Sequence, residues 1–300
     1  MKNISCNNCG LDQHSVIFKG RDRLYKVDNK LFNYVKCSNC GLVFIDPQPE
    51  SEELKRYYPE EYGPYRDNNE VFRYGPLSML FKNLKQRLGK NSARSLTQDE
   101  RILNYLDFGC GSGESLMSVK EKHHDWILYG LDNNEYACKK AKEKGFGVFC
   151  GDILKMEIPV NFFDTVNMGH VIEHLSDPKK TLLKINTIMK PGSEIIISTP
   201  NYDSWVAQFF RTYWYDLDAP RHLFLYTPIT LERLLEDTGF IIEKIEFDKG
   251  PKVGIRSMYY LFGKKDLRIN PFIWKLFEPV SYVLSKFGKT SIMTIHARKV

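Results

Sequence analysis

The sequence lacks several features that would place it in a specialised class of protein. No apolar run approaches the roughly 18 residues that a membrane span needs, so we expect no transmembrane helix. The opening residues, MKNISCNNCG, contain no apolar stretch typical of a secretory signal, and we expect a cytoplasmic protein. Low-complexity tracts are also missing. With 300 residues and 42% apolar content, the chain can bury the core of one large domain and a small one.

Cysteine is scarce, at seven residues, and four of the seven form two CxxC pairs. CNNCG contains Cys6 and Cys9, and CSNCG contains Cys37 and Cys40. In a reducing compartment this pattern indicates metal binding rather than disulfides, and Cys138 and Cys150 are not expected to pair. The two pairs supply the four thiolate ligands of a closed structural Zn²⁺ site, and short strands between them predict a zinc ribbon over residues 1–50. A CxxC redox centre is the alternative, but no thioredoxin-like βαβ setting accompanies it.

Charge is unevenly distributed along the chain. The net charge is +6, yet residues 249–300 hold eleven Lys/Arg against two acidic residues, a local net charge of +9. A basic C-terminal part suggests an anionic partner, such as a phosphate-bearing substrate, a lipid surface or nucleic acid, although a merely solvated face is equally typical. Within it, NPFIWKLFEPVSYVLSKFGK mixes aromatic residues with lysines. It suits peripheral membrane contact or a cover over a pocket, but Pro279 is expected to interrupt it, and packing against the sheet or a second subunit is the commoner outcome.

From residue 101 the pattern alternates between buried strands and amphipathic helices. This alternation predicts an α/β fold over residues 101–300 with a doubly wound parallel sheet and a site at the carboxyl ends of its strands. Residues 51–100 are expected to form a linker followed by a helix, SMLFKNLKQRLGK, that covers the large domain.

A glycine-rich loop follows the first of these strands, in LDFGCGSG. Its glycines allow close backbone approach to a ligand, although Glu114 stands where the dinucleotide fingerprint GxGxxG has its last glycine. Asp132 ends the second strand, where a carboxylate can accept hydrogen bonds from two ribose hydroxyls. Asp152 ends the third strand and could bind an adenine amino group while Ile153 packs against the ring. The combination predicts an adenosine site.

In these motifs the chain resembles the class I S-adenosylmethionine-dependent methyltransferases. LDFGCGSG, GLDNN, CGDI and FDTVNMGHVIEHLSDP occur in that family's order and at its spacing over about residues 101–247. The resemblance implies a Rossmann-like seven-stranded sheet whose last strand is antiparallel. It also implies S-adenosylmethionine as methyl donor, held by Asp107, Gly109, Gly111, Gly113, Asp132, Asn133, Asp152 and Ile153.

The whole chain resembles the subgroup with an N-terminal pair of CxxC knuckles, often encoded among sugar, polysaccharide or natural-product genes. It lacks the further C-terminal domain of the deoxysugar C-methyltransferases, which argues against carbon methylation. The predicted activity is O-methylation of a small molecule, such as a sugar, a polysaccharide precursor or a lipid or natural-product hydroxyl. A zinc-ribbon methyltransferase of ribosomal or transfer RNA, and a non-catalytic binding protein, are the alternatives.

Two histidines are candidate catalytic residues. HVIEH matches the HxxEH pattern of zinc proteases, but Pro178 leaves too short a helix for such a site. The family likeness instead carries EHL onto Glu173, His174 and Leu175. His174 could accept a hydroxyl proton near neutral pH, or it could only pack and fix the loop.

His222 is the second candidate, in DAPRHLFLYTP. The sequence around it is rich in aromatic residues, which suit either a sugar or apolar pocket or an ordinary core. Its neighbour Arg221 could hold an acceptor carboxylate or phosphate in a bidentate clamp.

Overall fold

The computed structural model describes residues 4–59, 102–264 and 266–300. The helix predicted in SMLFKNLKQRLGK lies outside the described residues, as does most of the predicted segment 51–100. The described elements are, in chain order, β1 (His14–Gly20), β2 (Phe32–Cys37), β3 (Val43–Ile45), α1 (Ser51–Lys55), β4 (Asn104–Phe108), α3 (Glu114–Lys120), β5 (Ile127–Asp132), α4 (Glu135–Glu143), β6 (Gly147–Cys150), η2 (Ile153–Lys155), β7 (Phe163–Gly169), η3 (Ile172–His174), α5 (Pro178–Ile188), β8 (Met189–Pro200), α6 (Trp205–Phe210), η4 (Arg211–Tyr213), η5 (Tyr215–Leu217), β9 (Phe224–Leu225), α7 (Pro228–Glu236), β10 (Phe240–Phe247), α8 (Lys252–Leu261), α9 (Pro271–Lys286) and β11 (Ile292–Lys299).

Seven strands form the large sheet, in the order β10-β11-β8-β7-β4-β5-β6. From β8 to β6 all neighbours pair in parallel, whereas β11 lies between β10 and β8 and is antiparallel to both. This confirms the predicted Rossmann-like sheet with an antiparallel last strand. The carboxyl ends of β4, β5, β6 and β7 share one edge, which is where open α/β sheets bind their ligands.

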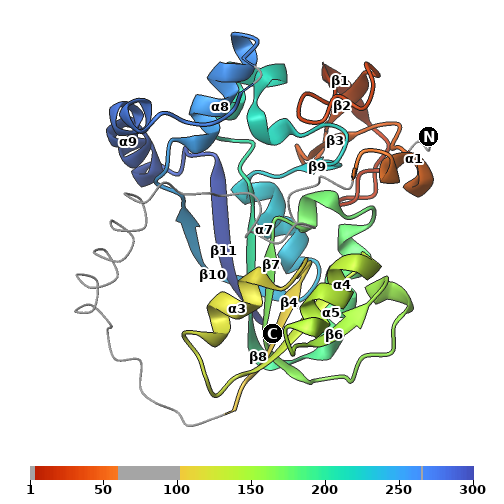
Figure 1. Cartoon of the computed structure of the whole chain (residues 1–300). Coiled ribbons are helices and arrows are strands. Elements are labelled where there is room, and N and C mark those ends of the chain that lie inside the picture. Colours follow the sequence, from red (N-terminus) through yellow and green to blue (C-terminus); the bar gives the residue numbers. More distant parts are fainter. Residues whose placement is uncertain (1–3, 60–101, 265) are drawn as a thin grey trace.

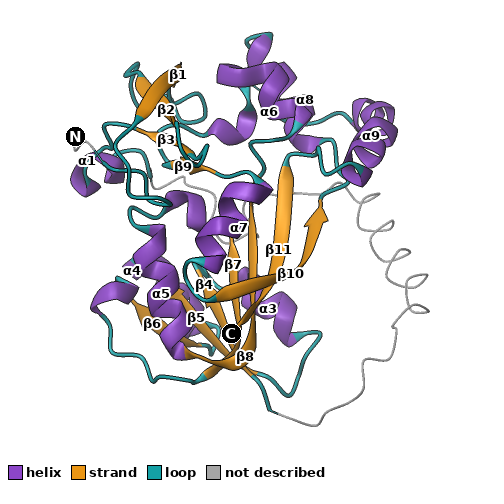
Figure 2. Ribbon diagram, turned by 180° about the vertical axis from the view of Figure 1, so that it is seen from behind, coloured by secondary structure: helices purple, strands orange, loops and turns teal. Residues whose placement is uncertain are grey.

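Helices cover both faces of the large sheet (Figures 1 and 2). Successive side chains of a strand point to opposite faces, so neighbours in β4 join different clusters. Tyr105 packs in a cluster with Leu116 of α3 and Ala141 of α4. The next residue, Leu106, belongs to a second cluster that includes Leu182 of α5. The sheet is therefore doubly wound, as the alternating pattern predicts.

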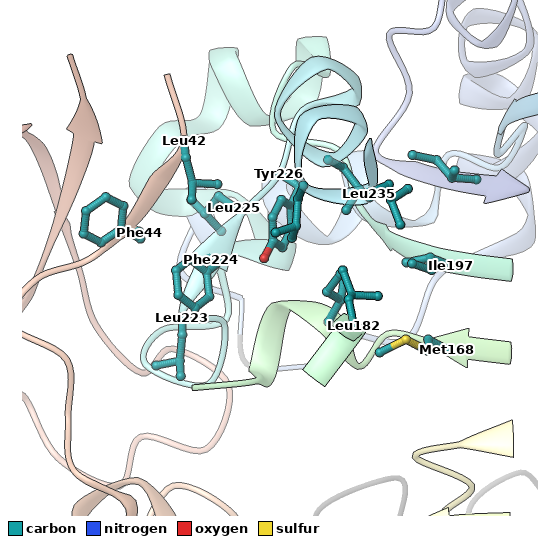
Figure 3. Packing of buried hydrophobic residues seen from close by; sticks show 14 of the residues in the cluster. Leu42, Phe44, Met168, Leu182, Ile197, Leu223, Phe224, Leu225, Tyr226 and Leu235 are labelled. Atoms are coloured by element: carbon teal, nitrogen blue, oxygen red, sulfur yellow. The ribbon is translucent and has the colours of Figure 1, made fainter. Parts of the chain in front are cut away.

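The N-terminal cysteine motifs lie in a smaller four-stranded sheet, of order β1-β2-β3-β9. Its fourth strand, β9, comes from the C-terminal part of the chain and pairs antiparallel with β3, with Phe44 opposite Phe224. The core is continuous across this junction (Figure 3): Leu42 and Phe44 lie beside Phe224, and Tyr226 leads on toward the large sheet. The small sheet is thus tied to the large one by a strand from the C-terminal part of the chain and by a shared core.

Helix α7 begins and ends at local signals in its sequence. The side chain of Thr227 accepts a hydrogen bond from the backbone N–H of Thr230, Pro228 occupies the first turn, and Gly239 just beyond the helix has φ +83°. These are the standard start and stop signals of a helix. Its apolar face, with Leu231, is buried in the core.

Helix α9 differs from its prediction because it continues through Pro279 instead of being interrupted there. Proline removes one N–H from the helix and leaves a carbonyl without its partner. Pro279 is exposed, so water can satisfy that carbonyl and the helix persists. Among the described residues, none of the helices combines the length and apolar character needed to cross a membrane.

Cys138 and Cys150 form a disulfide, contrary to the expectation that they stay unpaired. Cys138 lies on α4 and Cys150 ends β6, and the packing of that helix against that strand brings their Cα atoms to 5.9 Å. This separation is within the range that a disulfide requires. The contact is tertiary, so spacing in the sequence did not reveal it.

Candidate active site

The glycine-rich loop joins β4 to α3 at the carboxyl edge of the sheet. Gly109, Gly111 and Gly113 all have positive φ, at +81°, +51° and +86°, a region that side chains with a Cβ atom rarely adopt. A Cβ atom on Gly109 would also lie 2.4 Å from Cγ2 of Val171. The loop therefore needs glycine at this position both for its backbone conformation and for the close approach of the segment after β7.

Asp107, on β4, is buried beneath this loop. Its carboxylate accepts hydrogen bonds from the hydroxyl of Ser115 and, at 2.9 Å, from the side-chain amide of Asn167. Burial raises the pKa of Asp107 above its usual range, against the lowering effect of these two hydrogen bonds. Neither Ser115 nor Asn167 was identified from the sequence: Asn167 reaches Asp107 through the pairing of β4 with β7, and Ser115 reaches it from the first turn of α3.

Asp132 ends β5 next to the loop. Its Oδ2 accepts a hydrogen bond of 2.9 Å from the backbone N–H of Gly111, and its Oδ1 accepts one of 2.9 Å from Asn134. Burial raises the pKa of Asp132, and the backbone hydrogen bonds oppose that rise. Each carboxylate oxygen keeps a further lone pair, so the group can still accept from a ligand. Asn133, the next residue, is exposed at the same edge.

Asp152 and Ile153 follow β6, the third strand along this edge. Asp152 caps η2 by accepting a hydrogen bond of 3.0 Å from the backbone N–H of Leu154, and about half of its side chain is exposed. Ile153 is buried. The structure thus brings all eight predicted donor-binding residues to the ends of three adjacent strands.

His174 and His222 come from segments far apart in the sequence, and the fold places their rings 4.6 Å apart between centroids. Nδ1 of His174 lies 3.0 Å from the carbonyl oxygen of Arg221, and Nδ1 of His222 lies 2.7 Å from that of Asp216. A carbonyl oxygen only accepts, so each Nδ1 carries a proton and the lone pair of each neutral ring resides on Nε2. Burial and the neighbouring charge of His222 lower the pKa of His174 to about 4.

Glu173 joins these histidines, and its part in the site was not recognised from the sequence. It is buried, its Oε2 accepts a hydrogen bond of 2.9 Å from Thr199, and its Oε1 lies 3.3 Å from Nδ1 of His170. Burial alone would raise the pKa of Glu173, but the hydrogen bond and charge of His170 outweigh it and hold the pKa at about 2. Glu173, His174 and His222 are called the acceptor cluster below.

The interpretation of Arg221 as an acceptor clamp is wrong. Its side chain is fully buried and bidentate to Asp218, with bonds of 2.9 and 2.6 Å, while the same guanidinium donates to Asp22 at 2.8 Å and to the carbonyl of Tyr57 at 2.9 Å. Asp22 and Tyr57 belong to the N-terminal part of the chain. Arg221 therefore fastens that part to the segment that carries His222.

The aromatic residues near His222 divide into two groups. Trp214 and Phe224 are buried in the core, in line with the interpretation as ordinary packing. Trp205 and Phe209 are 64% and 76% exposed on α6, so they do not enclose His222. The sequence pattern alone did not distinguish these groups.

The four cysteines of the CxxC pairs converge at one point of the small sheet. Their Sγ atoms all lie within 4.8 Å of one another, with Cys6 3.3 Å from Cys40 and Cys9 3.5 Å from Cys37. Gly10 follows the first pair with φ +75° and lets its turn close. The donor set and its geometry fit a tetrahedral zinc site.

The first cysteine knuckle also contacts the large domain. Nδ2 of Asn8 donates to the carbonyl of Thr230 on α7 at 2.6 Å. Oδ1 of Asn7 accepts from the backbone N–H of Lys179 at 3.0 Å, in the first turn of α5. The knuckle thus packs on two helices that cover the sheet.

Comparison with known proteins identifies the family. The sequence matches the family described as a methyltransferase domain over residues 80–245. The chain is similar to the ubiquinone biosynthesis O-methyltransferase of Coxiella burnetii, with 27% identity over 129 residues, or 41% of this chain and 52% of that protein. It is also similar to the demethylmenaquinone methyltransferase of Listeria welshimeri, with 26% identity over 136 residues, or 42% of this chain and 57% of that protein. The chain spans about half the length of these curated relatives.

Among solved structures, the S-adenosylmethionine-dependent methyltransferase from Archaeoglobus fulgidus aligns with a TM-score of 0.47 and 23% identity, over 78% of this chain and 100% of that one. The family match spans more than half of the chain. The chain therefore belongs to the methyltransferase domain family, and the predicted class, the S-adenosylmethionine-dependent methyltransferases, is confirmed.

Proposed function

We propose that this protein transfers a methyl group from S-adenosylmethionine to a hydroxyl oxygen of a small molecule. The observation that carries the proposal is the contact between the two halves of the site. Val171, two residues before Glu173, fills the space where a side chain on Gly109 would lie. The acceptor cluster is therefore adjacent to the glycine-rich loop, as a direct transfer between donor and acceptor requires.

The chain's buried carboxylates fit the donor. Neither Asp107 nor Asp132 forms an ion pair with a described residue, and both are buried. A ligand that carries an ammonium group and two ribose hydroxyls would satisfy Asp107 and Asp132, respectively. Asp152 and Ile153 would hold the adenine. S-adenosylmethionine supplies a methyl group that its positive sulfur already activates, so the chain's main task is to bind and orient.

The acceptor cluster would activate the hydroxyl. Both imidazoles hold their Nδ1 protons against backbone carbonyls, which leaves the lone pair of each neutral ring on Nε2, and Nε2 of His222 lies 4.0 Å from Oε1 of Glu173. Such lone pairs can assist the transfer by accepting the hydroxyl proton or by holding a cation that acidifies it. In either case, His174→Asn should lower turnover on the order of 10² while leaving donor binding intact.

A basic cavity between the N-terminal part of the chain and the residues around Tyr260 supports an anionic acceptor. The cavity has a volume of about 340 Å³, and its cationic lining residues are Arg21, Arg23, Lys26 and Lys264. Burial and the charge of Arg21 lower the pKa of Arg23, and an anion between the two guanidinium groups would relieve their repulsion.

The lining residues of this cavity lie close to Asp218, a neighbour of His222. A smaller hollow shares Arg21 and Arg23 with it and is lined by Asp218. Oδ2 of Asp218 lies 3.9 Å from Nε2 of His222. A phosphate-bearing sugar, glycan precursor or lipid precursor would place its anionic group in the cavity and its hydroxyl at the acceptor cluster. Demethylmenaquinone, which the name of one relative gives, has no anionic group for a basic cavity to bind.

Cys6, Cys9, Cys37 and Cys40 would hold a structural Zn²⁺. Four thiolates use all four positions of a tetrahedral ion and leave none open for catalysis. The ion would stabilise the small sheet to which β9 contributes, and thereby the segment that carries His222. Its role is therefore to position the acceptor side of the site.

The test is transfer of labelled methyl from S-adenosylmethionine into separate pools of phosphorylated sugars and glycan precursors, lipids and quinones, and total RNA. We expect label in the sugar or lipid pool, and none when Asp132 is replaced by Ala. Label in RNA alone would contradict the proposed acceptor and favour an RNA methyltransferase. Absence of transfer together with absence of donor binding would contradict the proposed activity itself.

A further inference from the structure

The acceptor cluster has the composition and spacing of a metal site. One ring nitrogen of each histidine and one carboxylate oxygen of Glu173 all lie within 4.8 Å of one another. Around a tetrahedral ion with bonds of about 2.1 Å, ligand atoms are about 3.4 Å apart. Small side-chain shifts would therefore bring the three atoms onto one ion. This site is separate from the cysteine site and differs from it in donor chemistry.

The histidines are oriented as metal ligands usually are. A ligating imidazole commonly donates its other ring N–H to a carbonyl or carboxylate, which fixes the tautomer and aims the lone pair. His174 does so to the carbonyl of Arg221 at 3.0 Å, and His222 to that of Asp216 at 2.7 Å. The hydroxyl of Tyr58 also lies 3.1 Å from Nδ1 of His174. Both rings are thus held at Nδ1 by backbone carbonyls, which leaves Nε2 of each ring as the nitrogen available to bind a metal ion.

Glu173 is the third proposed ligand beside the two histidines. Its Oε2 is held by Thr199 at 2.9 Å, while its Oε1 lies 4.0 Å from Nε2 of His222. That distance is too long for a hydrogen bond. Glu173 and His222 are therefore close without a hydrogen bond between them, and Oε1 also lies 3.3 Å from Nδ1 of His170, a contact that the ion would replace or share.

We propose that Glu173, His174 and His222 bind one divalent transition-metal ion, which takes the acceptor's hydroxyl as a further ligand. Two imidazoles and a carboxylate suit Zn²⁺, Mn²⁺, Fe²⁺ and Co²⁺. Three protein ligands leave positions open, as in catalytic metal sites and unlike the closed cysteine site. The inference rests on the proposed function, because it assigns the means of hydroxyl activation at that site.

In this scheme the methyl transfer needs no histidine to accept the hydroxyl proton. A hydroxyl bound to the ion loses its proton to water more easily, because the ion lowers the pKa of the hydroxyl. The oxygen–carbon bond then forms as the sulfur–carbon bond breaks, and the donor leaves as neutral S-adenosylhomocysteine. The two histidines act in this scheme as ligands, and Glu173 supplies the negative charge that helps to retain the ion.

In the experiment, Mn²⁺ is titrated into the purified 300-residue chain, whose cysteine site holds zinc. The loss of the electron paramagnetic resonance signal of free Mn²⁺ measures binding, and it requires no turnover. We expect one Mn²⁺ per chain and binding weakened at least about tenfold in His222→Asn and in Glu173→Gln. The control is His296→Ala, which removes a histidine that contacts Glu194 at 2.7 Å on the sheet and should bind Mn²⁺ as the original chain does.

Binding of S-adenosylmethionine, measured on the same samples, shows that each variant is folded. The metal site is overturned if the original chain does not bind Mn²⁺. It is also overturned if the two cluster variants bind Mn²⁺ as tightly as the original chain does. Methyl transfer that is unaffected by added Mn²⁺, Zn²⁺ or Co²⁺ in metal-depleted buffer also overturns it while leaving the proposed function intact. Mn²⁺ binding without transfer to any acceptor supports the site and contradicts the proposed function.

Discussion

The ion-pair network of Arg221 gives a prediction about stability that the structure makes quantitative. Arg221 is fully buried, and the side chain of Asp22 that it binds is fully buried too. Replacing Arg221 with Met keeps much of the apolar stem but leaves two acidic side chains without their cation. Breaking a buried pair in this way costs about 3–5 kcal/mol. At about 2–4 °C per kcal/mol for a chain of this size class, the melting temperature should fall by about 10 °C.

Scanning calorimetry on Arg221→Met measures this shift, and Arg268→Met provides the matched control. Arg268 makes a similar bidentate contact with Asp266, but both side chains are exposed, at 91% and 58%. Solvent screens that pair, so its loss should leave the melting temperature unchanged. The double variant Arg221→Met, Asp22→Asn should recover part of the loss, because it removes one stranded charge. Equal melting temperatures for Arg221→Met and Arg268→Met would refute the reasoning.

Three further predictions concern Asp132, the glycine-rich loop and the cysteine site. Asp132→Ala should weaken S-adenosylmethionine binding on the order of 10² in calorimetric titration, because two charge-assisted hydrogen bonds are lost; unchanged affinity would remove Asp132 from the site. Gly109→Ala should destabilise the chain by more than Gly145→Ala, which shares a positive φ of +87° but meets nothing within 4 Å and so costs only about 1 kcal/mol. Elemental analysis should find one Zn²⁺ per chain fewer in Cys37→Ser than in Cys110→Ser, and equal zinc contents in the two variants would contradict the cysteine site.

Much of the large sheet was predictable because its signals are local. Buried strands, helix caps and glycine stops repeat along the chain from residue 101, as at Thr227 and Gly239 around α7. The positions of Asp132 and Asp152 follow from the same logic, since a carboxylate at the end of each parallel strand reaches a common edge, whereas the role predicted for Asp107 came from the family resemblance. The CxxC pairs were equally informative, because two residues between cysteines suffice to place both thiolates on one turn.

The interactions that the sequence did not reveal join residues distant along the chain. Strand β9 is only two residues long and pairs with β3, which no periodicity could indicate. Arg221 was interpreted as a ligand clamp because its partner Asp22 is brought to it only by docking of the two sheets. Glu173 was treated as part of a motif, and its contact with Thr199 depends on the pairing of β7 with β8.

The measurement that tests the central claim most directly is nuclear magnetic resonance of the product formed with S-adenosylmethionine labelled with ¹³C in its transferable methyl group. The chemical shift of that methyl carbon reports the atom to which it is bonded. The proposed function predicts an oxygen-bound methyl on a small molecule that carries a phosphate group. A methyl bonded to nitrogen or carbon, or found in RNA, would contradict it.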